Sequence, residues 1–274
     1  MTSERTFTDH LGRVVNLPVL PQRIISLCPS QTETLMALGV GERLVGRTRF
    51  CIHPQEDLRS VKNVGGTKMV DFERIRALQP DLIIGEKEEN TALMITALAA
   101  EWPVYVTDVR DVESARKMVL DLGQLTGTED VARTIVAKVD ASFAGIRPFK
   151  TPVSCLYLIW KDPWMVVGAD TFIDSVLEKC GFHNLGRDLV GRYPVVTEEI
   201  FKEKMPEMVL LSSEPFPFSE GHYAELQDIM PRSVVKLVDG EMFSWYGSHL
   251  VDVEIYLNQV LQDSFACLSL HNSV

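Results

Sequence analysis

Short apolar runs alternate with stretches of helical spacing along the first 110 residues of the chain. The runs are brief and rich in β-branched residues, which is typical of buried strands in a parallel sheet. They occupy residues 23–28, 44–46, 82–85 and 104–106. Between them, apolar side chains recur at helical intervals, and we expect helices over residues 32–38, 71–78 and 92–100. Alternating strands and helices predict an α/β lobe over residues 1–110 with a mostly parallel sheet.

The first helix is expected to begin at Thr32. Pro29–Gln31 interrupts the preceding apolar run, and a threonine hydroxyl can accept a hydrogen bond from a free N–H of the first turn. Glu33 follows in that turn, where the helix dipole favours a carboxylate. Gly39 ends the helix.

Residues 111–148 carry helical spacing without any strand-like run. Apolar side chains recur every three or four positions on both sides of Gly127. Thr128, followed by two acidic residues, favours a helix start, and Pro148 ends the pattern. We therefore predict a helical segment that contains one long helix connecting two α/β halves.

Residues 149–274 repeat the order of the first half, with strands expected over 153–160 and 209–212 and a helix over 169–180. Two segments, 71–84 and 197–210, align closely. In each, a capping residue is followed two places later by a glutamate, Glu73 or Glu199, and seven places after that by a proline that precedes a strand. The repeat predicts two related Rossmann-like lobes with a ligand cleft between them.

The charge of the chain limits the partners it can have. It contains 38 acidic and 27 basic side chains among 274 residues, a net charge of −11. Binding to duplex nucleic acid or to anionic membranes requires a basic surface, so neither is expected. No apolar run approaches the roughly 18 residues of a membrane helix, and the first ten residues contain no apolar core, so no signal peptide is expected.

Motifs of common catalytic and metal sites are missing from the chain. The five cysteines are scattered without a C-x-x-C pair, which favours small packing side chains over disulfides or a zinc site. No phosphate-binding loop, G-x-S-x-G or H-E-x-x-H motif is present. His249 with Glu241 is the sole acid–base pair that keeps an enzyme among the alternatives.

Aromatic side chains gather in three loops of the second half: Trp160–Met165, Arg192–Pro194 and Phe243–Tyr246. Rigid aromatic groups at strand ends suit a flat or hydrophobic ligand. The alternative is that the tryptophans cover a sheet edge. Glu73 and Glu199 are open to two interpretations as well: acidic residues of a helix start, or two matched contacts for basic patches on a dimeric partner.

Several stretches resemble a known protein family. They are residues 7–13, 21–27, 29–33, 38–39, 64–66 and 78–83. These stretches are similar to the helical-backbone substrate-binding proteins of ABC importers, which are receptors for vitamin B12, ferric siderophores and haem. The vitamin B12-binding members are the most similar. The resemblance spans essentially the whole chain and implies two α/β lobes, one rigid connecting helix and a cleft that moves little on binding.

The resemblance also implies a set of functional residues. Glu73 and Glu199 match the positions that contact arginines of the two permease subunits. The ligand-binding set is Phe50, Thr67, Lys68, Trp160, Trp164, Met165, Arg192, Tyr193, Glu241, Trp245 and Tyr246. Arg192, Lys68 or Arg49 would pair with carboxylates or phosphates of the ligand.

This chain departs from the vitamin B12-binding pattern at several positions. Thr67 replaces a tryptophan, Glu241 an aspartate and Trp245 an arginine. Cys180 matches one member of a disulfide, but Asn258 stands where its partner would be. These departures count against cobalamin itself and not against the binding role, and the resemblance implies a metal chelate as the ligand: a corrinoid, a ferric siderophore or haem.

The expected protein is a non-catalytic monomer without a covalently bound cofactor or a resident metal ion. It would deliver its ligand to an ABC permease without inserting into the membrane. By resemblance it belongs in the periplasm or at the cell surface, once a leader has been removed. A leaderless cytoplasmic carrier or sensor is the alternative.

Overall fold

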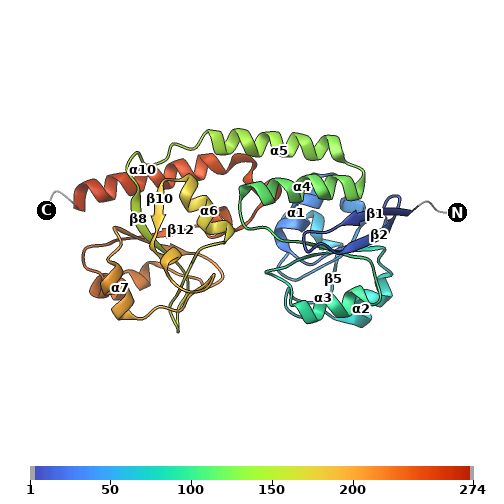
Figure 1. The fold of residues 1–274 in the computed structure, drawn as a ribbon, viewed down its shortest axis with the longest axis horizontal. Helices are drawn as coiled ribbons and strands as arrows, with labels where there is room; N and C mark the ends of the chain where they lie inside the picture. The colour runs from blue at the N-terminus through green and yellow to red at the C-terminus, as the bar shows by residue number, and fades with distance from the viewer. Residues whose placement is uncertain (1–3, 272–274) are drawn as a thin grey trace. The chain divides into compact units, whose positions relative to one another are not determined.

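The computed structural model describes residues 4–271 of the chain (Figure 1). The chain forms two compact units. Unit 1 combines the chain up to Val109 with Glu113–Val139 and Tyr246–Val251, and unit 2 contains the remainder. No helix among the described residues is long and apolar enough to cross a membrane.

Unit 1 is built around a parallel sheet of five strands in the order β5-β4-β3-β6-β7. The strands are β3 (Ile24–Ser26), β4 (Leu44–Arg47), β5 (Lys62–Asn63), β6 (Leu82–Glu86) and β7 (Val104–Thr107). A separate antiparallel hairpin is formed by β1 (Glu4–Thr8) and β2 (Val14–Pro18). The expected α/β architecture with a parallel central sheet is confirmed.

Helices cover both faces of this sheet, which is why its strands are apolar on both sides. They are α1 (Pro29–Ala37), α2 (Phe72–Leu78), α3 (Ala92–Ala99) and α4 (Val112–Thr126), whereas α5 (Glu129–Ala144) packs against α4. Figure 1 shows α2 and α3 on one side of the sheet, and α1 and α4 on the other. The side chains of Ile25, Ile83 and Val106 are fully buried and pack together in one cluster of the core.

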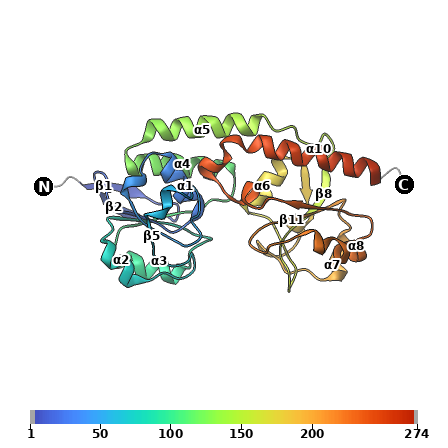
Figure 2. The same cartoon turned by 180° about the vertical axis from the view of Figure 1, so that it is seen from behind.

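Unit 2 contains a sheet in which β10-β8-β11-β12 run parallel and β9 pairs antiparallel with β8. The strands are β8 (Val153–Trp160), β9 (Met165–Val166), β10 (Phe182–Asn184), β11 (Met208–Ser212) and β12 (Val234–Val238). The helices are α6 (Phe172–Lys179), α7 (Glu198–Lys204), α8 (Tyr223–Ile229), α9 (Glu241–Ser244) and α10 (Val253–His271). Figure 2 shows α6 and α10 on one side of the sheet, and α7 and α8 on the other.

The repeated sequence segments form matching structures. Helices α2 and α7 both end at a residue in the left-handed conformation, Gln79 (φ 45°) and Met205 (φ 44°), directly before a proline. The acidic residue after each proline then binds the start of the unit's first sheet strand. Asp81 accepts hydrogen bonds from the backbone N–H groups of Gln22 and Arg23, at 2.7 and 2.8 Å, just before β3.

In unit 2, Glu207 does the same for β8, because its carboxylate accepts from the backbone N–H of Ser154 at 2.8 Å. The strands joined in this way are parallel neighbours in both sheets: β3 with β6, and β8 with β11. The two units therefore repeat one local design.

The start of α1 differs from the expectation. The helix begins at Pro29, and Cys28 rather than Thr32 is its N-cap residue. A proline fits the first helical position, since its fixed φ is helical and its missing N–H has no partner to lose there. The Thr32 hydroxyl instead donates within the helix to the Cys28 carbonyl at 3.0 Å.

The helical segment contains two helices, α4 and α5, which are separated at Gly127. Gly127 has φ +72°, and a Cβ atom at this position would lie 2.6 Å from Leu20 Cδ2. The long connecting helix is α5, because the division between the units falls within it, after Val139.

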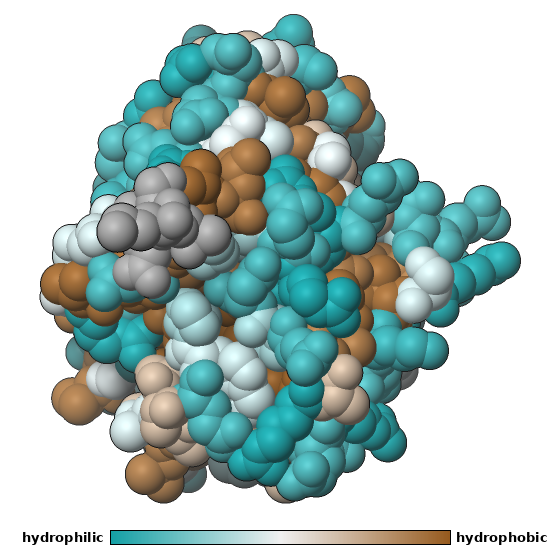
Figure 3. Space-filling model, turned by 90° about the vertical axis from the view of Figure 1, so that its right-hand side faces the viewer, coloured by the Kyte–Doolittle hydropathy of each residue, from teal (hydrophilic) through white to brown (hydrophobic). Residues whose placement is uncertain are grey.

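Figure 3 views the protein from the side of unit 1, and the described residues on this face form no large continuous hydrophobic patch. Apart from the grey terminal residues, that view is mostly hydrophilic, and the hydrophobic residues lie in small groups. Such a surface is ordinary for a chain of this acidic composition.

Candidate functional site

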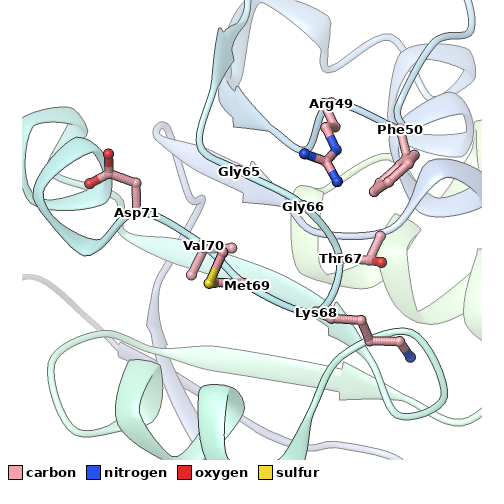
Figure 4. Close-up of a pocket in the computed structure, with 9 residues that line it drawn as sticks. All are labelled: Arg49, Phe50, Gly65, Gly66, Thr67, Lys68, Met69, Val70 and Asp71. Carbon is pink, nitrogen blue, oxygen red and sulfur yellow. The ribbon is translucent and has the colours of Figure 1, made fainter.

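The candidate site of unit 1 lies where its parallel strands end. Carboxyl ends of parallel strands meet at one edge of a sheet, and ligands of α/β proteins bind at that edge. A pocket of about 410 Å³ opens there, between the loop after β4 and the turn after β5 (Figure 4). It is lined by Arg49, Phe50 and residues 65–71. Four residues predicted to bind ligand, Arg49, Phe50, Thr67 and Lys68, are thus brought together.

Arg49 and Phe50 form one side of the pocket in Figure 4. The Arg49 guanidinium carbon lies 4.7 Å from the centre of the Phe50 ring, a cation–π distance. The Arg49 N–H donates to the Gly65 carbonyl at 2.8 Å, which ties this loop to the opposite wall. Phe50 is 46% exposed, an unusual value for a large apolar side chain. Together the two residues offer a flat apolar surface beside a positive charge.

The opposite wall is a tight turn that depends on glycine. Gly65 has φ +129°, and a Cβ atom there would lie 2.7 Å from the Met69 carbonyl oxygen. The N–H of Gly66 donates to the same carbonyl at 2.7 Å. A side chain at position 65 would therefore collide with the turn that holds the pocket wall.

Thr67 and Lys68 lie in this turn and are anchored to the loop after β6. The Lys68 ammonium donates to the Glu88 carbonyl at 2.5 Å, and the amide of Asn90 donates to the Thr67 carbonyl at 2.8 Å. Thr67 is buried, and Lys68 is exposed. Lys68 therefore has a backbone partner while its charge stays accessible to solvent.

Two carboxyl groups lie near this turn: that of Glu86, the last residue of β6, and that of Glu89, in the loop after β6. Glu86 accepts hydrogen bonds from the N–H groups of Glu88, Glu89 and Val109, at 2.6, 2.9 and 3.3 Å. Burial nevertheless raises the pKa of Glu86 to about 7. Burial also raises the pKa of Glu89, against the attraction of the Lys68 charge. The Glu86 carboxyl group can thus gain or lose a proton near neutral pH.

Tyr246 lies in the interior of unit 1. Its hydroxyl is 3.5 Å from the Cys28 Sγ, and burial raises the pKa of both groups far above their ordinary values. The segment that carries it is held to α1, since the N–H groups of Tyr246 and Ser248 donate to Ser30 and Thr34 at 3.3 and 3.2 Å. Tyr246 is therefore a residue of the interior rather than of an exposed loop.

In unit 2, the predicted aromatic residues differ in exposure. Trp160, the last residue of β8, is 40% exposed, and its ring makes an edge contact with Phe216. Trp164 is half-buried and stacks on Phe218 with 6.1 Å between ring centres. Trp245 is buried and donates its indole N–H to Glu214 at 3.1 Å. Of the three predicted tryptophans, Trp160 therefore presents the most surface.

The remaining predicted residues of unit 2 lie in β9, in the loop that is hydrogen-bonded to β9 and the residues after it, and after β12. Met165, Arg192 and Tyr193 are half-buried, and the Arg192 carbonyl accepts from the Gly168 N–H at 2.8 Å. Glu241 follows β12, and its charge contributes to the raised pKa of Glu214, for which burial is the main cause.

The two predicted docking residues are exposed on the matching helices α2 and α7. The Glu73 side chain is 84% exposed and accepts a hydrogen bond from Arg76 at 2.6 Å. Arg76 is also bound by Glu101 at 2.6 and 2.9 Å. Glu199 accepts from the Thr197 hydroxyl, which lowers its pKa and keeps it charged.

Possible catalytic and metal-binding groups are few. His249 Nδ1 lies 3.0 Å from a carboxylate oxygen of Glu33, within hydrogen-bond distance, and both residues belong to unit 1. Between residues 4 and 271, no group of three His, Cys, Asp or Glu side chains is placed to hold a metal ion. All five cysteines are free thiols, and Asn258 forms hydrogen bonds with the backbone of Gly145 and Arg147.

Glu86, Glu89 and Asn90 were not predicted as site residues. Their sequence signal is a group of polar residues at the end of the buried strand 82–86 and directly after it. Polar loops of this kind are common on protein surfaces, and only the fold shows that Glu86 and Asn90 are buried beside the pocket wall.

Comparison with known proteins places this chain among binding proteins. A family model described as "Periplasmic binding protein" matches residues 24–236. The vitamin B12-binding protein of Vibrio campbellii is 29% identical over 216 residues, which is 77% of each chain. An uncharacterized ABC transporter substrate-binding lipoprotein of Bacillus subtilis is 27% identical over 208 residues, which cover 72% of this chain and 66% of the lipoprotein.

Among solved structures, the periplasmic heme-binding protein of Roseiflexus sp. RS-1 superposes with a TM-score of 0.74. The match covers 88% of this chain and 99% of the other, at 21% identity. This likeness shows that the two chains share a fold.

Proposed function

Because the chain belongs to the periplasmic binding protein family, we propose that it is the substrate-binding protein of an ABC importer for a metal chelate. The ligand classes considered are a corrinoid, haem and a ferric siderophore. Similarity to a vitamin B12-binding protein and to a heme-binding protein supports the first two, both planar metal-bearing macrocycles. The observation that carries the proposal is the pocket of unit 1, where an exposed aromatic ring lies beside two cationic side chains at the strand ends.

In unit 1, Phe50 would pack against the flat face of the ligand. Covering a large exposed ring removes much apolar surface from water, which favours binding. Arg49 and Lys68 would pair with carboxylate or phosphate groups at its edge. The Lys68 ammonium already donates a hydrogen bond to the Glu88 carbonyl, so it would attract the ligand mainly through its charge. Thr67 would contact the ligand as part of the turn that lines the pocket.

In unit 2, Trp160 would be the principal aromatic contact, with Tyr193 and Met165 beside it. Arg192 and Glu241 would supply polar contacts. Trp164 and Trp245 would support this surface from beneath, since Trp164 stacks on Phe218 and the buried Trp245 is bonded to Glu214. Tyr246 would support the site of unit 1 in the same way.

Docking on the permease would use Glu73 and Glu199. Their exposure on two equivalent helices is what two identical basic patches on a dimeric partner would require. An arginine of the partner would have to displace Arg76 from Glu73. Arg76 would still be hydrogen-bonded to Glu101 after this displacement, which lowers its energetic cost. The protein would act as a monomer on the outer side of the cytoplasmic membrane.

The test is a titration of the purified protein with cyanocobalamin, haemin and a set of ferric siderophores, followed by quenching of tryptophan fluorescence. Saturable one-to-one quenching by one compound is expected, and the Phe50→Ala and Arg49→Met variants should weaken it by at least tenfold. Arg59→Met is the matched control, because Arg59 is exposed in unit 1 outside the pocket. No saturable quenching by any of these compounds would refute the receptor assignment.

A soluble sensor is the second candidate, and the five free thiols favour it, because cysteines in oxidising compartments usually pair. Fractionation of the native cells separates the two. Recovery with the periplasmic or membrane fraction supports the importer role, and recovery with the cytoplasm supports the sensor.

A further inference from the structure

Asn90 occupies a central position beside the pocket of unit 1. It follows β6 and is only 3% exposed. Its Nδ2 donates to the carbonyl oxygens of Thr67 and Leu27, at 2.8 and 3.3 Å, and its Oδ1 accepts from the Glu86 N–H at 2.8 Å. One carboxamide thus joins the pocket wall to the ends of two neighbouring strands, β3 and β6.

We propose that Asn90 is the positioning residue of this pocket. Its carboxamide fixes Thr67, and with it the turn of residues 65–71, against the ends of β3 and β6. Thr67 and Lys68 are adjacent in that turn, so the same contact sets where both face the pocket. That the turn contacts a ligand rests on the proposed function, whereas the positioning itself does not.

Aspartate, alanine and glutamine would each lose at least one of these three contacts. An aspartate has the same size but donates no hydrogen bond when charged, and it would face two carbonyl oxygens. An alanine would leave the Thr67 carbonyl without its amide partner. A buried acceptor without a partner destabilises the folded state by more than the net stabilisation that its hydrogen bond provides. A glutamine carries its carboxamide one methylene farther from the backbone, so the amide would not meet the same three partners.

Gly85 lies close to the Asn90 carboxamide and leaves no space for a side chain of its own. A Cβ atom at Gly85 would lie 2.8 Å from Asn90 Oδ1 and 2.9 Å from Ile95 Cδ1. Gly85→Ala therefore displaces the carboxamide without changing its chemistry. This variant offers a second, independent way to disturb the same contact.

The experiment measures hydrogen exchange of the backbone amides in residues 64–71 of the full-length protein. The N–H groups of Gly66 and Asp71 are protected there by bonds to the Met69 and Val64 carbonyls. The variants are Asn90→Ala, Asn90→Asp and Gly85→Ala. Urea unfolding of each variant reports its global stability.

Asn184→Ala is the matched control. Asn184 lies in unit 2, is 2% exposed and also forms three hydrogen bonds: to the Val167 carbonyl at 3.1 Å, to Asp174 at 2.9 Å and from the Gly186 N–H at 3.0 Å. Its loss should lower the stability of the protein by a similar amount but leave the pocket wall of unit 1 intact.

Exchange in residues 64–71 should be roughly tenfold faster in Asn90→Ala and Gly85→Ala than in the wild type, and unchanged in Asn184→Ala. In Asn90→Asp the protection should return as the pH is lowered, because a protonated carboxyl group can again donate to Thr67. Asn90→Ala should show no such recovery. Equal acceleration in the control, or none in the Asn90 variants, would overturn the proposal.

Binding of cyanocobalamin and haemin to the same variants then tests the link to the ligand. A tenfold weaker affinity in Asn90→Ala, with wild-type affinity in Asn184→Ala, is expected. If neither compound binds the wild type, the receptor assignment fails, while the exchange measurement still decides the role of Asn90.

Discussion

Glu86 offers a quantitative test of the environment behind the pocket. Glu86 is the last residue of β6, and burial of its carboxyl group raises its pKa from 4.5 to about 7. Between these pH values the unfolded chain has released the proton and the folded protein still holds it. The folded state is then stabilised by low pH, and this contribution is lost as the pH rises from about 4.5 to about 7.

The size of the effect follows from the shift in pKa. Each pH unit within this window changes the free energy of unfolding by about 1.4 kcal/mol, which amounts to about 3 kcal/mol across it. A glutamine cannot ionise and keeps an acceptor oxygen for the N–H groups of Glu88 and Glu89. The Glu86→Gln variant should therefore lose less stability than the wild type between pH 5 and pH 8, by about 2–3 kcal/mol.

The assay is urea unfolding followed by circular dichroism at pH 5, 6, 7 and 8, with the wild type, Glu86→Gln and Glu220→Gln. Glu220 is exposed in unit 2, so its variant should follow the wild-type profile. Parallel profiles for the wild type and Glu86→Gln would show that burial does not hold the proton on Glu86, and would refute the reasoning.

Three further predictions concern the wall, the thiols and the docking residues. Gly65→Ala should lower the free energy of unfolding by about 2–3 kcal/mol in urea, because its Cβ would meet Met69 at a strained φ; an unchanged midpoint would contradict this. Of the five thiols, Cys267 alone should react with a thiol reagent in the native protein, since the other four are buried with raised pKa values; all five should react in denaturant. Glu73→Ala with Glu199→Ala should abolish transport through the reconstituted permease at unchanged ligand affinity, and an equal loss of affinity would exclude docking as their role.

The parallel strands and the repeat of α2 and α7 follow from local sequence. A run of β-branched residues favours a buried strand, and a proline ends the helix that precedes it. Both effects depend on residues that are close together in the sequence. Gln79 and Met205 stop their helices at the same distance before proline, which is why the two segments could be aligned without a structure.

The polar side chains of α1 show the limit of this local reasoning. Ser30 and Thr34 are buried, although polar residues in a helix are usually exposed to solvent. Their partners, Tyr246 and Ser248, follow more than 200 residues later, so no pattern within the helix could reveal them. Thr32 is a different case, because the residues that place it inside the helix, Cys28 and Pro29, are close to it in the sequence.

Local hydrophobic patterning and turn residues thus determine the strands, most helices and the internal repeat, since these features depend on interactions between neighbours in the chain. Burial and hydrogen bonding between distant segments are settled only when the chain is folded. They place Tyr246 and Trp245 in the interior, and they bury Glu86 and Asn90 behind the pocket wall. A polar residue in a loop has the same local sequence whether solvent or a buried carbonyl surrounds it, so its role emerges only from the tertiary structure.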